Sequence, residues 1–212
     1  MKEQRPEQGQ GDRAEGPEED LGAGLMLRWQ AGDEGAFTEL VEAYSGRVYS
    51  LLTRFLGPVA QREDLVQDVF LRVLRAKDRY TPTARFSTWV YRITFNLATN
   101  HRERAGLRRH LSLDQSVGED STAFAELVPD ESTPSPEEAL NQGDVVAAVR
   151  AAIERLPETQ RMALILARYD ELPYAEIAVV LDSSEKAIKS LVHRARENLR
   201  VLLAPLLEEE VA

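Results

Sequence analysis

Residues 85–104 read RFSTWVYRITFNLATNHRER, and this stretch decides the fold class. On a helix at about 100° per residue, four apolar side chains point within about 40° of one direction: Phe86, Val90, Ile93 and Leu97. An amphipathic helix buries such a stripe against its neighbours. The segment is therefore predicted to be a core-packed helix, and it carries more aromatic and polar side chains than the stripe accounts for.

Those additional side chains form two flanks of the same helix. One holds Trp89, Arg92, Asn96 and Asn100, and the roughly opposite one holds Tyr91, Phe95 and Arg102. One interpretation is a helix packed between two neighbours, with amides and arginines at its surface. The other is nucleic-acid contact, because amides match base edges, arginine pairs with phosphate and aromatic rings stack on unpaired bases.

The helical period runs through most of the chain, and no segment shows strand alternation beside turn signals. The predicted fold class is therefore all-α. Gly57-Pro58 is a clear stop signal, and Asp33 is expected to cap the helix that ends there. Ser87 or Thr88 is expected to cap the helix of the opening stretch.

Composition indicates two small helical domains joined by a flexible acidic linker. Residues 106–143 are rich in Ser, Asp, Glu, Gly and Pro, and Pro134 and Pro136 favour extended chain. So long a segment without structure is uncommon inside one compact domain. The predicted division is a disordered acidic tail at 1–20, a domain at 21–105, the linker at 106–143, a helix-turn-helix domain at 144–205 and an acidic tail at 206–212.

Composition also excludes several classes of protein. The 212 residues include no cysteine and three scattered histidines, so we expect no disulfide framework, no metal site and no cofactor. No secretory signal opens the chain, and no stretch approaches the ~20 apolar residues of a membrane span. We expect a soluble, cytoplasmic protein with no membrane contact of its own.

The charge is unevenly distributed along the chain. The net charge of −10 argues against a polyanionic partner when taken alone. Residues 72–109, however, hold ten basic and two acidic groups, and residues 184–200 hold five and two. Both stretches fall on predicted helices, and the local field matters more than the total charge for attracting nucleic acid.

Residues 174–194 fit a helix-turn-helix. The turn usually takes glycine, and Asp182 stands there instead, a residue that tolerates the left-handed region. Ser183 or Ser184 can cap the second helix, which would then enter a major groove. That helix presents Lys186, Lys189, Ser190, His193, Arg194 and Arg196. The alternative is a plain helical hairpin with a solvated basic face.

Five motifs in series resemble one family. They are EDLVQDVFLRVLR (63–75), RFSTWVYRITFNLATNHRER (85–104), LPETQRMALIL (156–166), YAEIAVVL (174–181) and KAIKSLVHRARENLR (186–200). In this order, with an acidic linker between them, they resemble the extracytoplasmic-function (group IV) sigma factors of bacterial RNA polymerase. The resemblance covers roughly residues 24–105 and 144–203.

The resemblance implies a role for each motif. The first would bind the clamp helices of the largest subunit of core RNA polymerase, through Asp64, Gln67 and Phe70. The second would open and read the minus-ten promoter element, through Trp89, Arg92, Asn96, Asn100 and Arg102. The recognition helix would read the minus-thirty-five element with the six side chains named above. The linker would lie in the RNA exit path, and an anti-sigma factor would hold the protein inactive.

Three classes of function compete at this point. A sigma factor is a non-enzymatic specificity subunit that needs polymerase and promoter DNA. An ordinary helix-turn-helix regulator would bind duplex DNA without polymerase, and the flank of Trp89, Asn96 and Asn100 argues against it. An enzyme is disfavoured because the sequence holds no nucleophile-base motif, metal spacing or phosphate loop.

Overall fold

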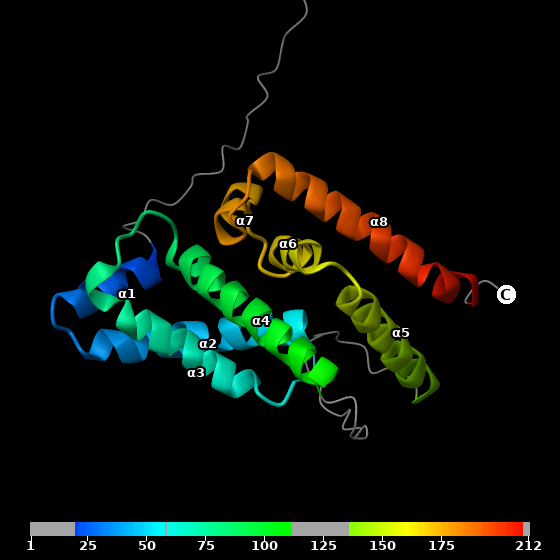
Figure 1. The fold of residues 1–212 in the computed structure, drawn as a ribbon, viewed down its shortest axis with the longest axis horizontal. Helices are drawn as coiled ribbons and strands as arrows, with labels where there is room; N and C mark the ends of the chain where they lie inside the picture. The colour runs from blue at the N-terminus through cyan, green and yellow to red at the C-terminus, as the bar shows by residue number, and fades with distance from the viewer. Residues whose placement is uncertain (1–19, 58, 112–135, 210–212) are drawn as a thin grey trace, which may run out of the picture.

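The computed structural model describes residues 20–57, 59–111 and 136–209. These residues form eight α-helices and one short 3₁₀ helix, without a strand among them (Figure 1). The all-α fold class predicted from the sequence is confirmed. None of the described helices combines the length and the apolarity needed to cross a bilayer.

The N-terminal group of helices is built around three long ones. Its elements are α1 (Leu21–Gln30), α2 (Gly35–Leu56), α3 (Arg62–Arg75), the 3₁₀ helix η1 (Lys77–Arg79) and α4 (Phe86–Leu111). Helices α2, α3 and α4 pack against one another, and α1 packs on α2 and on the beginning of α4. The predicted stripe on α4 lies in this core, since Phe86 and Val90 are fully buried and Leu97 nearly so.

The C-terminal group consists of four helices. They are α5 (Pro136–Glu154), α6 (Glu158–Arg168), α7 (Tyr174–Val180) and α8 (Glu185–Glu209). Helix α8 runs along α6 and α7 and also touches α5. Pro157 and Pro173 stand immediately before α6 and α7, where their fixed φ angle and missing N–H suit the start of a helix.

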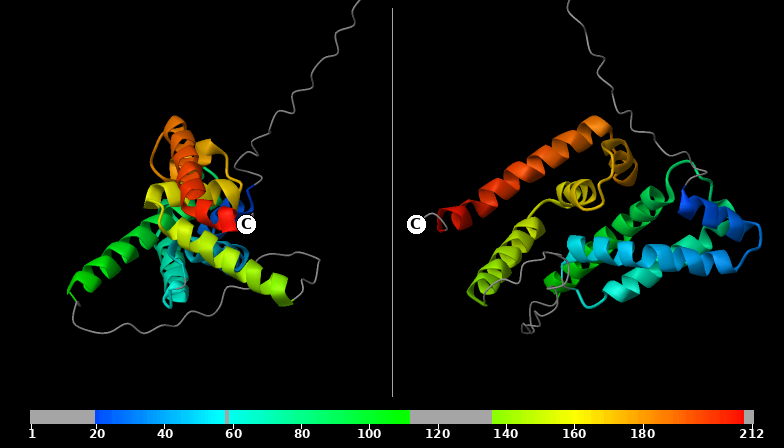
Figure 2. Two further views of the ribbon diagram at one scale, coloured as in Figure 1. Left: turned by 90° about the vertical axis from the view of Figure 1, so that its right-hand side faces the viewer. Right: turned by 180° about the vertical axis from the view of Figure 1, so that it is seen from behind.

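The two groups of helices pack directly against each other. Helix α4 lies on α7, and α2 lies on α6, so that buried residues of both groups form one continuous core cluster. Figure 2 shows α4 beside the C-terminal helices in two further orientations. The face of α4 opposite its exposed flank is covered by this contact.

Asp20 corrects the predicted limit of the acidic tail. It is the N-cap of α1, where its Oδ1 accepts a hydrogen bond from the Gly22 amide at 3.0 Å. Its Oδ2 accepts from the amide of Phe86, the first residue of α4. Asp20 therefore belongs to the folded domain and joins two helix starts, and residues 1–19 lie outside the described part of the chain.

The same contact overturns the predicted cap of α4. The helix begins at Phe86, so Ser87 and Thr88 stand inside its first turn and the free amide at its start is taken by Asp20. Near the start of α2, Asp33 Oδ1 accepts from the Gly35 amide at 3.1 Å, but the N-cap position is that of Glu34, whose side chain makes no capping hydrogen bond. The stop after α2 is correct, with Gly57 at a φ of 74°.

Helices extend into both ends of the predicted linker. Helix α4 continues to Leu111, and α5 begins at Pro136. Pro136 was expected to favour extended chain, but it stands at the first position of a helix, where proline's missing N–H removes no hydrogen bond. Residues 112–135, including Pro134, lie outside the described residues.

Candidate nucleic-acid interface

The first half of α8 presents the predicted recognition surface to solvent. Its six predicted side chains are all exposed, and at about 100° per residue they cover about 160° of the helix: Lys186, Lys189, Ser190, His193, Arg194 and Arg196. The opposite side turns inward through Ile188, Val192 and Ala195, which are 0–1% exposed. One side of the helix is thus fixed to the core while the other carries five basic or imidazole groups and a hydroxyl.

The turn before α8 has the conformation that the sequence predicts. Asp182 adopts a φ of 51°, in the left-handed region where glycine is usual. Ser184 is the capping residue, since its Oγ accepts from the Ala187 amide at 3.2 Å. The left-handed backbone at Asp182 reverses the chain after α7, and the Ser184 cap marks the start of α8.

The contact between α7 and α8 is apolar. Ile177 and Ile188 are fully buried in it, whereas Leu181 and Leu191 are only half-buried. Val192 and Ala195 fill the remaining contact, with Ala195 packing near Leu164. The spacing of residues 188, 192 and 195 is the helical signal that could have identified them.

The exposed flank of α4 carries three of the predicted side chains. Arg92, Asn96 and Asn100 follow one another at intervals of four residues, and all three are exposed. Trp89 precedes them on the same flank but is half-buried. Its ring lies 5.0 Å from that of Tyr80 and 5.6 Å from that of Phe86, centroid to centroid. One cation and two amides therefore line up beside an indole that is partly used for packing.

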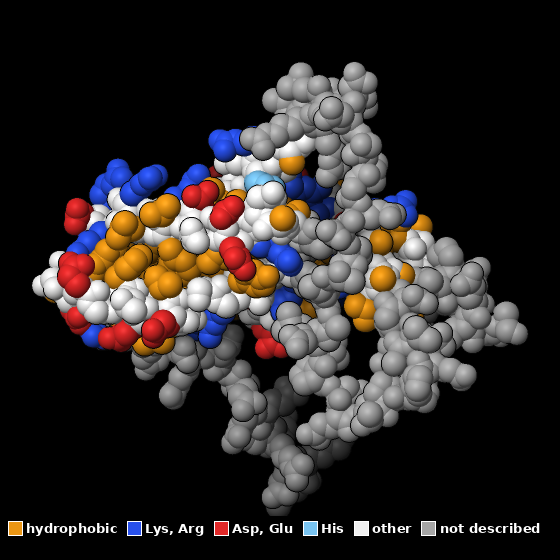
Figure 3. All heavy atoms as spheres, turned by 90° about the horizontal axis from the view of Figure 1, so that it is seen from below, with side chains coloured by type: hydrophobic (Ala, Val, Ile, Leu, Met, Phe, Trp, Pro, Cys, Tyr) orange, Lys and Arg blue, Asp and Glu red, His pale blue; other side chains and the backbone are white. Residues whose placement is uncertain are grey.

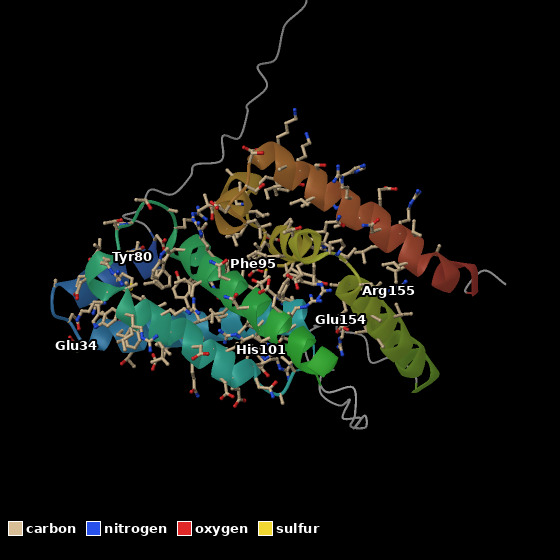
Figure 4. All side chains as sticks on the ribbon, in the orientation of Figure 1. Glu34, Tyr80, Phe95, His101, Glu154 and Arg155 are labelled. Carbon is tan, nitrogen blue, oxygen red and sulfur yellow. The ribbon has the colours of Figure 1, made fainter. Side chains whose placement is uncertain are left out.

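The opposite flank of α4 serves packing instead. Tyr91 is 2% exposed, and Phe95 makes an edge contact with Phe55 at 5.7 Å. Figure 4 shows Phe95 on the side of α4 that faces α6. Arg102 lies on this side too and forms an ion pair with Glu158 at 3.2 Å. The two interpretations of the helix each hold for one flank, and Arg102 is separated from the exposed amides.

On α3 the three predicted residues do not share one environment. Asp64 and Gln67 are exposed, whereas Phe70 is only 6% exposed and packs in the core beside Val69 and Val73. Phe70 falls on the buried stripe of α3, so it could contribute to a contact surface only by supporting the exposed face from the core.

The outer surface around α3 is partly apolar. Leu71 and Leu74 are each 44% exposed, and Tyr49 on α2 is 37% exposed. A shallow hollow between α2 and α3 is lined by Ser45, Gly46, Tyr49, Glu63, Val66 and Gln67. Figure 3 shows hydrophobic side chains gathered on this half of the molecule, with charged groups around them. Such a patch on a small domain is typical of a protein-binding surface.

Polar contacts cross the boundary between α4 and the C-terminal helices. Thr88 Oγ1 donates to Glu176 Oε2 at 2.6 Å, and the Tyr91 hydroxyl donates to Asp170 Oδ1 at 3.0 Å. Burial raises the pKa of the Asp170 carboxyl, and burial next to that carboxylate raises the pKa of the Tyr91 phenol. Arg92 reaches Asp182 at 3.4 Å.

Arg161 is a buried cation that the sequence analysis missed. It is 2% exposed and donates to the backbone carbonyls of Phe55 at 2.9 Å and Leu156 at 3.1 Å, and also to that of Glu154. Burial lowers the pKa of its guanidinium to about 10, which leaves it charged at neutral pH. It thereby joins the carboxyl ends of α2 and α5. The signal available in the sequence is one arginine directly before the apolar run MALIL.

Two family models match this chain. Residues 40–108 match the model "Sigma-70 region 2", and residues 147–199 match "Sigma-70, region 4". The first match covers α3, α4 and most of α2, and the second covers α6, α7 and the exposed first half of α8. Both surfaces described above thus fall within matched segments.

Curated proteins match over nearly their whole length. The RNA polymerase sigma-H factor of Pseudomonas aeruginosa is 35% identical over 87% of this chain and 95% of its own. The sigma factor SigW of Bacillus subtilis is 31% identical over 82% and 92%. The sigma-E factor of Escherichia coli is 33% identical over 86% and 94%.

Solved structures share the fold. CnrH, in complex with the cytosolic domain of CnrY, aligns with a TM-score of 0.63 at 24% identity over 88% of this chain and 99% of that one. The sigma factor RpoE of Bartonella quintana, in complex with the anti-sigma factor NepR, aligns with a TM-score of 0.63 at 20% identity over 79% and 96%. These likenesses support the arrangement of helices.

Proposed function

Since this chain belongs to the extracytoplasmic-function sigma factors of bacterial RNA polymerase, we propose that its two groups of helices bind two separate elements of a promoter. Membership in this family assigns the protein to promoter-specific initiation by RNA polymerase. The main support for two separate promoter contacts is that α4 and α8 each expose basic and polar side chains suited to DNA, and these two sets of side chains lie within different matched regions. The ordinary duplex-binding regulator is not favoured, because it has no use for a region 2.

The recognition helix α8 would read the minus-thirty-five element. Its first turns point away from the core, so Lys186, Lys189 and Ser190 can reach base edges in a major groove. His193, Arg194 and Arg196 follow one turn later, where phosphates would pass. The fixed inner side of α8 sets the register of these contacts.

The exposed flank of α4 would open and read the minus-ten element. Asn96 and Asn100 offer donor and acceptor groups to unstacked bases, and Arg92 offers charge to the adjacent phosphate. Trp89, half-buried against Tyr80, would stand at the fork where the strands part. We retain Arg102 as a phosphate contact only for a state in which its pair with Glu158 has opened.

Core polymerase would bind the outer surface of α3. Asp64 and Gln67 are exposed there, beside the apolar side chains Leu71 and Leu74. Phe70 would support this surface from the core. The clamp helices of the largest subunit are the partner that the family resemblance assigns to it.

Further assignments follow from membership in this family. We propose the domain limits 20–105 and 144–205, with residues between them as the linker that enters the RNA exit path. The chain would have no catalytic activity of its own and would work in the cytoplasm, where polymerase and chromosome meet. Two proteins of similar fold were solved in complex with the cytosolic domain of CnrY and with the anti-sigma factor NepR, and we propose an anti-sigma factor as a partner here too.

Transcription in vitro tests this function. Core polymerase and fragmented host DNA are incubated with and without the protein, and RNA 5′ ends are mapped. New starts that share two spaced upstream elements are expected. Absence of new starts, with duplex DNA still bound, would favour the ordinary regulator.

Replacing the two amides of α4 tests the minus-ten assignment. Asn96→Ala with Asn100→Ala should reduce promoter opening by at least about tenfold, because each lost base contact is worth roughly 1–3 kcal/mol. Permanganate reactivity of unpaired thymines measures opening, and affinity for core polymerase should stay unchanged. The matched control is Thr38→Ala, an exposed residue of α2. Normal opening by the double variant would contradict the assignment.

A further inference from the structure

The contact between the two groups of helices pairs a basic face with an acidic one. The N-terminal group supplies Arg85, Arg92 and Arg102 from α4 and the residue before it. Each meets a carboxylate of the C-terminal group: Arg85 with Glu176 at 3.5 Å, Arg92 with Asp182 at 3.4 Å and Arg102 with Glu158 at 3.2 Å. The complementarity is therefore spread along most of α4.

Two of these cations are groups that the proposed function assigns to DNA. A phosphate would have to compete with Glu158 for Arg102 and, less strongly, with the exposed Asp182 for Arg92. A carboxylate presents the same kind of anionic oxygen to a guanidinium as a phosphate does. Asp182 and Glu158 therefore pair with two guanidinium groups that the proposed function assigns to the DNA backbone.

Glu176 is the best-placed of the three carboxylates. Its side chain is 20% exposed, and it accepts from Thr88 Oγ1 at 2.6 Å in addition to pairing with Arg85. Glu158 and Arg102 are about one-third exposed, whereas Asp182 is 86% exposed and its pair is correspondingly weak. Packing around Arg161 keeps the two groups together, and the three carboxylates link α4 to α6, to α7 and to the turn before α8.

We propose that Glu158, Glu176 and Asp182 form an internal substitute for promoter phosphate that holds the free protein in a closed, autoinhibited arrangement. This inference rests on the proposed function of α4. DNA that uses Arg92 and Arg102 must displace Asp182 and Glu158, while Glu176 holds Arg85 and Thr88 and so keeps α4 against α7. Because the competent state is then only a fraction of the population, the apparent affinity for DNA is reduced by that fraction.

A charge-neutral triple variant tests the proposal in the full-length chain. Glu158→Gln, Glu176→Gln and Asp182→Asn keep side-chain size, and asparagine keeps the left-handed turn at position 182. The control Glu34→Gln, Glu39→Gln and Glu42→Gln removes the same charge and also breaks ion pairs, to Lys77 and Arg28, within the N-terminal group. Figure 4 shows Glu34 at the end of that group away from α6 and α7.

Two readouts are made without polymerase. The first is binding of a fluorescein-labelled, single-stranded DNA oligonucleotide of random sequence. The second is the distance between spin labels on Thr38→Cys and Val201→Cys, two exposed positions in a chain that has no cysteine of its own. The interface triple should bind DNA about tenfold more tightly than the control triple and should show a longer, broader distance distribution.

The outcomes separate this inference from the proposed function. Equal DNA affinities and equal distance distributions for the two triples would overturn autoinhibition, even if the parent protein directs transcription. A longer distance between the labels in the interface triple, with DNA affinity unchanged, would also overturn it. Separation of the two groups of helices would then expose no side chain that binds DNA. Failure of the parent to direct transcription with core polymerase would instead sink the proposed function.

Discussion

Gly22 lies where α1 crosses the beginning of α4, directly against the ring of Phe86. A Cβ atom at position 22 would stand 2.5 Å from Phe86 Cδ1 and 2.6 Å from Phe86 Cβ. Both residues are buried, and Asp20 ties the same two helix ends together. A methyl group has no room here unless one of the helices moves.

Gly22→Ala should therefore lower the free energy of unfolding by about 1–3 kcal/mol, the usual effect of overpacking. Urea denaturation followed by circular dichroism measures it. Gly24→Ala is the matched control on the same helix, since a Cβ there meets nothing within 4 Å. That variant should gain roughly 0.5–1 kcal/mol from helix propensity. Equal effects at both positions would mean that the crossing is looser than described.

Single residues also show where sequence reasoning stops. Exposure of Lys189 or Asn96 follows from local helical period and was predicted correctly. The burial of Phe70 and the ion pair of Arg102 could not be predicted, because they depend on which helix covers each side chain, and the period of one helix does not specify that. Asp20 and Arg161 were missed for the same reason, since their partners lie far along the chain.

At the scale of the element, α8 is the part of the molecule that sequence describes best. Its cap, its turn at Asp182 and its inner face all arise from residues within a few positions of one another. Helix α4 is the opposite case, because both of its flanks carry aromatic and cationic side chains and its own period does not specify which flank another helix covers.

The salt dependence of DNA binding should show whether the basic side chains of α8 contact phosphate. Lys189→Ala with Arg194→Ala removes two phosphate or base contacts and should reduce the slope of log affinity against log salt by about 2. Fluorescence anisotropy with duplex promoter DNA and the polymerase holoenzyme measures it. Arg155→Ala with Arg168→Ala, exposed positions of the same group of helices, removes equal charge elsewhere. A slope unchanged from the parent's would remove Lys189 and Arg194 from the interface.

At the scale of the whole molecule, the closed arrangement depends on pH through Tyr91. Burial raises the pKa of its phenol in the closed form, above the usual value of about 10. The neutral phenol favours the closed form, and this stabilisation is complete below the ordinary pKa of an exposed tyrosine. It is lost progressively as the pH rises from that value through the raised pKa of the closed form. Closure should therefore weaken from about pH 10 upward.

The labelled pair at positions 38 and 201 measures this weakening. The parent should show a lengthening distance as pH rises above about 10, as the exposed form ionises and gains population. Tyr91→Phe keeps the ring but cannot ionise, so its distance should change less over the same range. Identical pH profiles for parent and variant would show that Tyr91 does not control the contact with Asp170.

Asp20 sets a limit on proteolytic processing of this protein. A protease that cleaves after Asp20 would remove a carboxylate that accepts from the amides of Gly22 and of Phe86, which lies 66 positions further along the chain. Cleavage there should lower the free energy of unfolding of the N-terminal group, because the starts of α1 and α4 would each lose a hydrogen-bond acceptor.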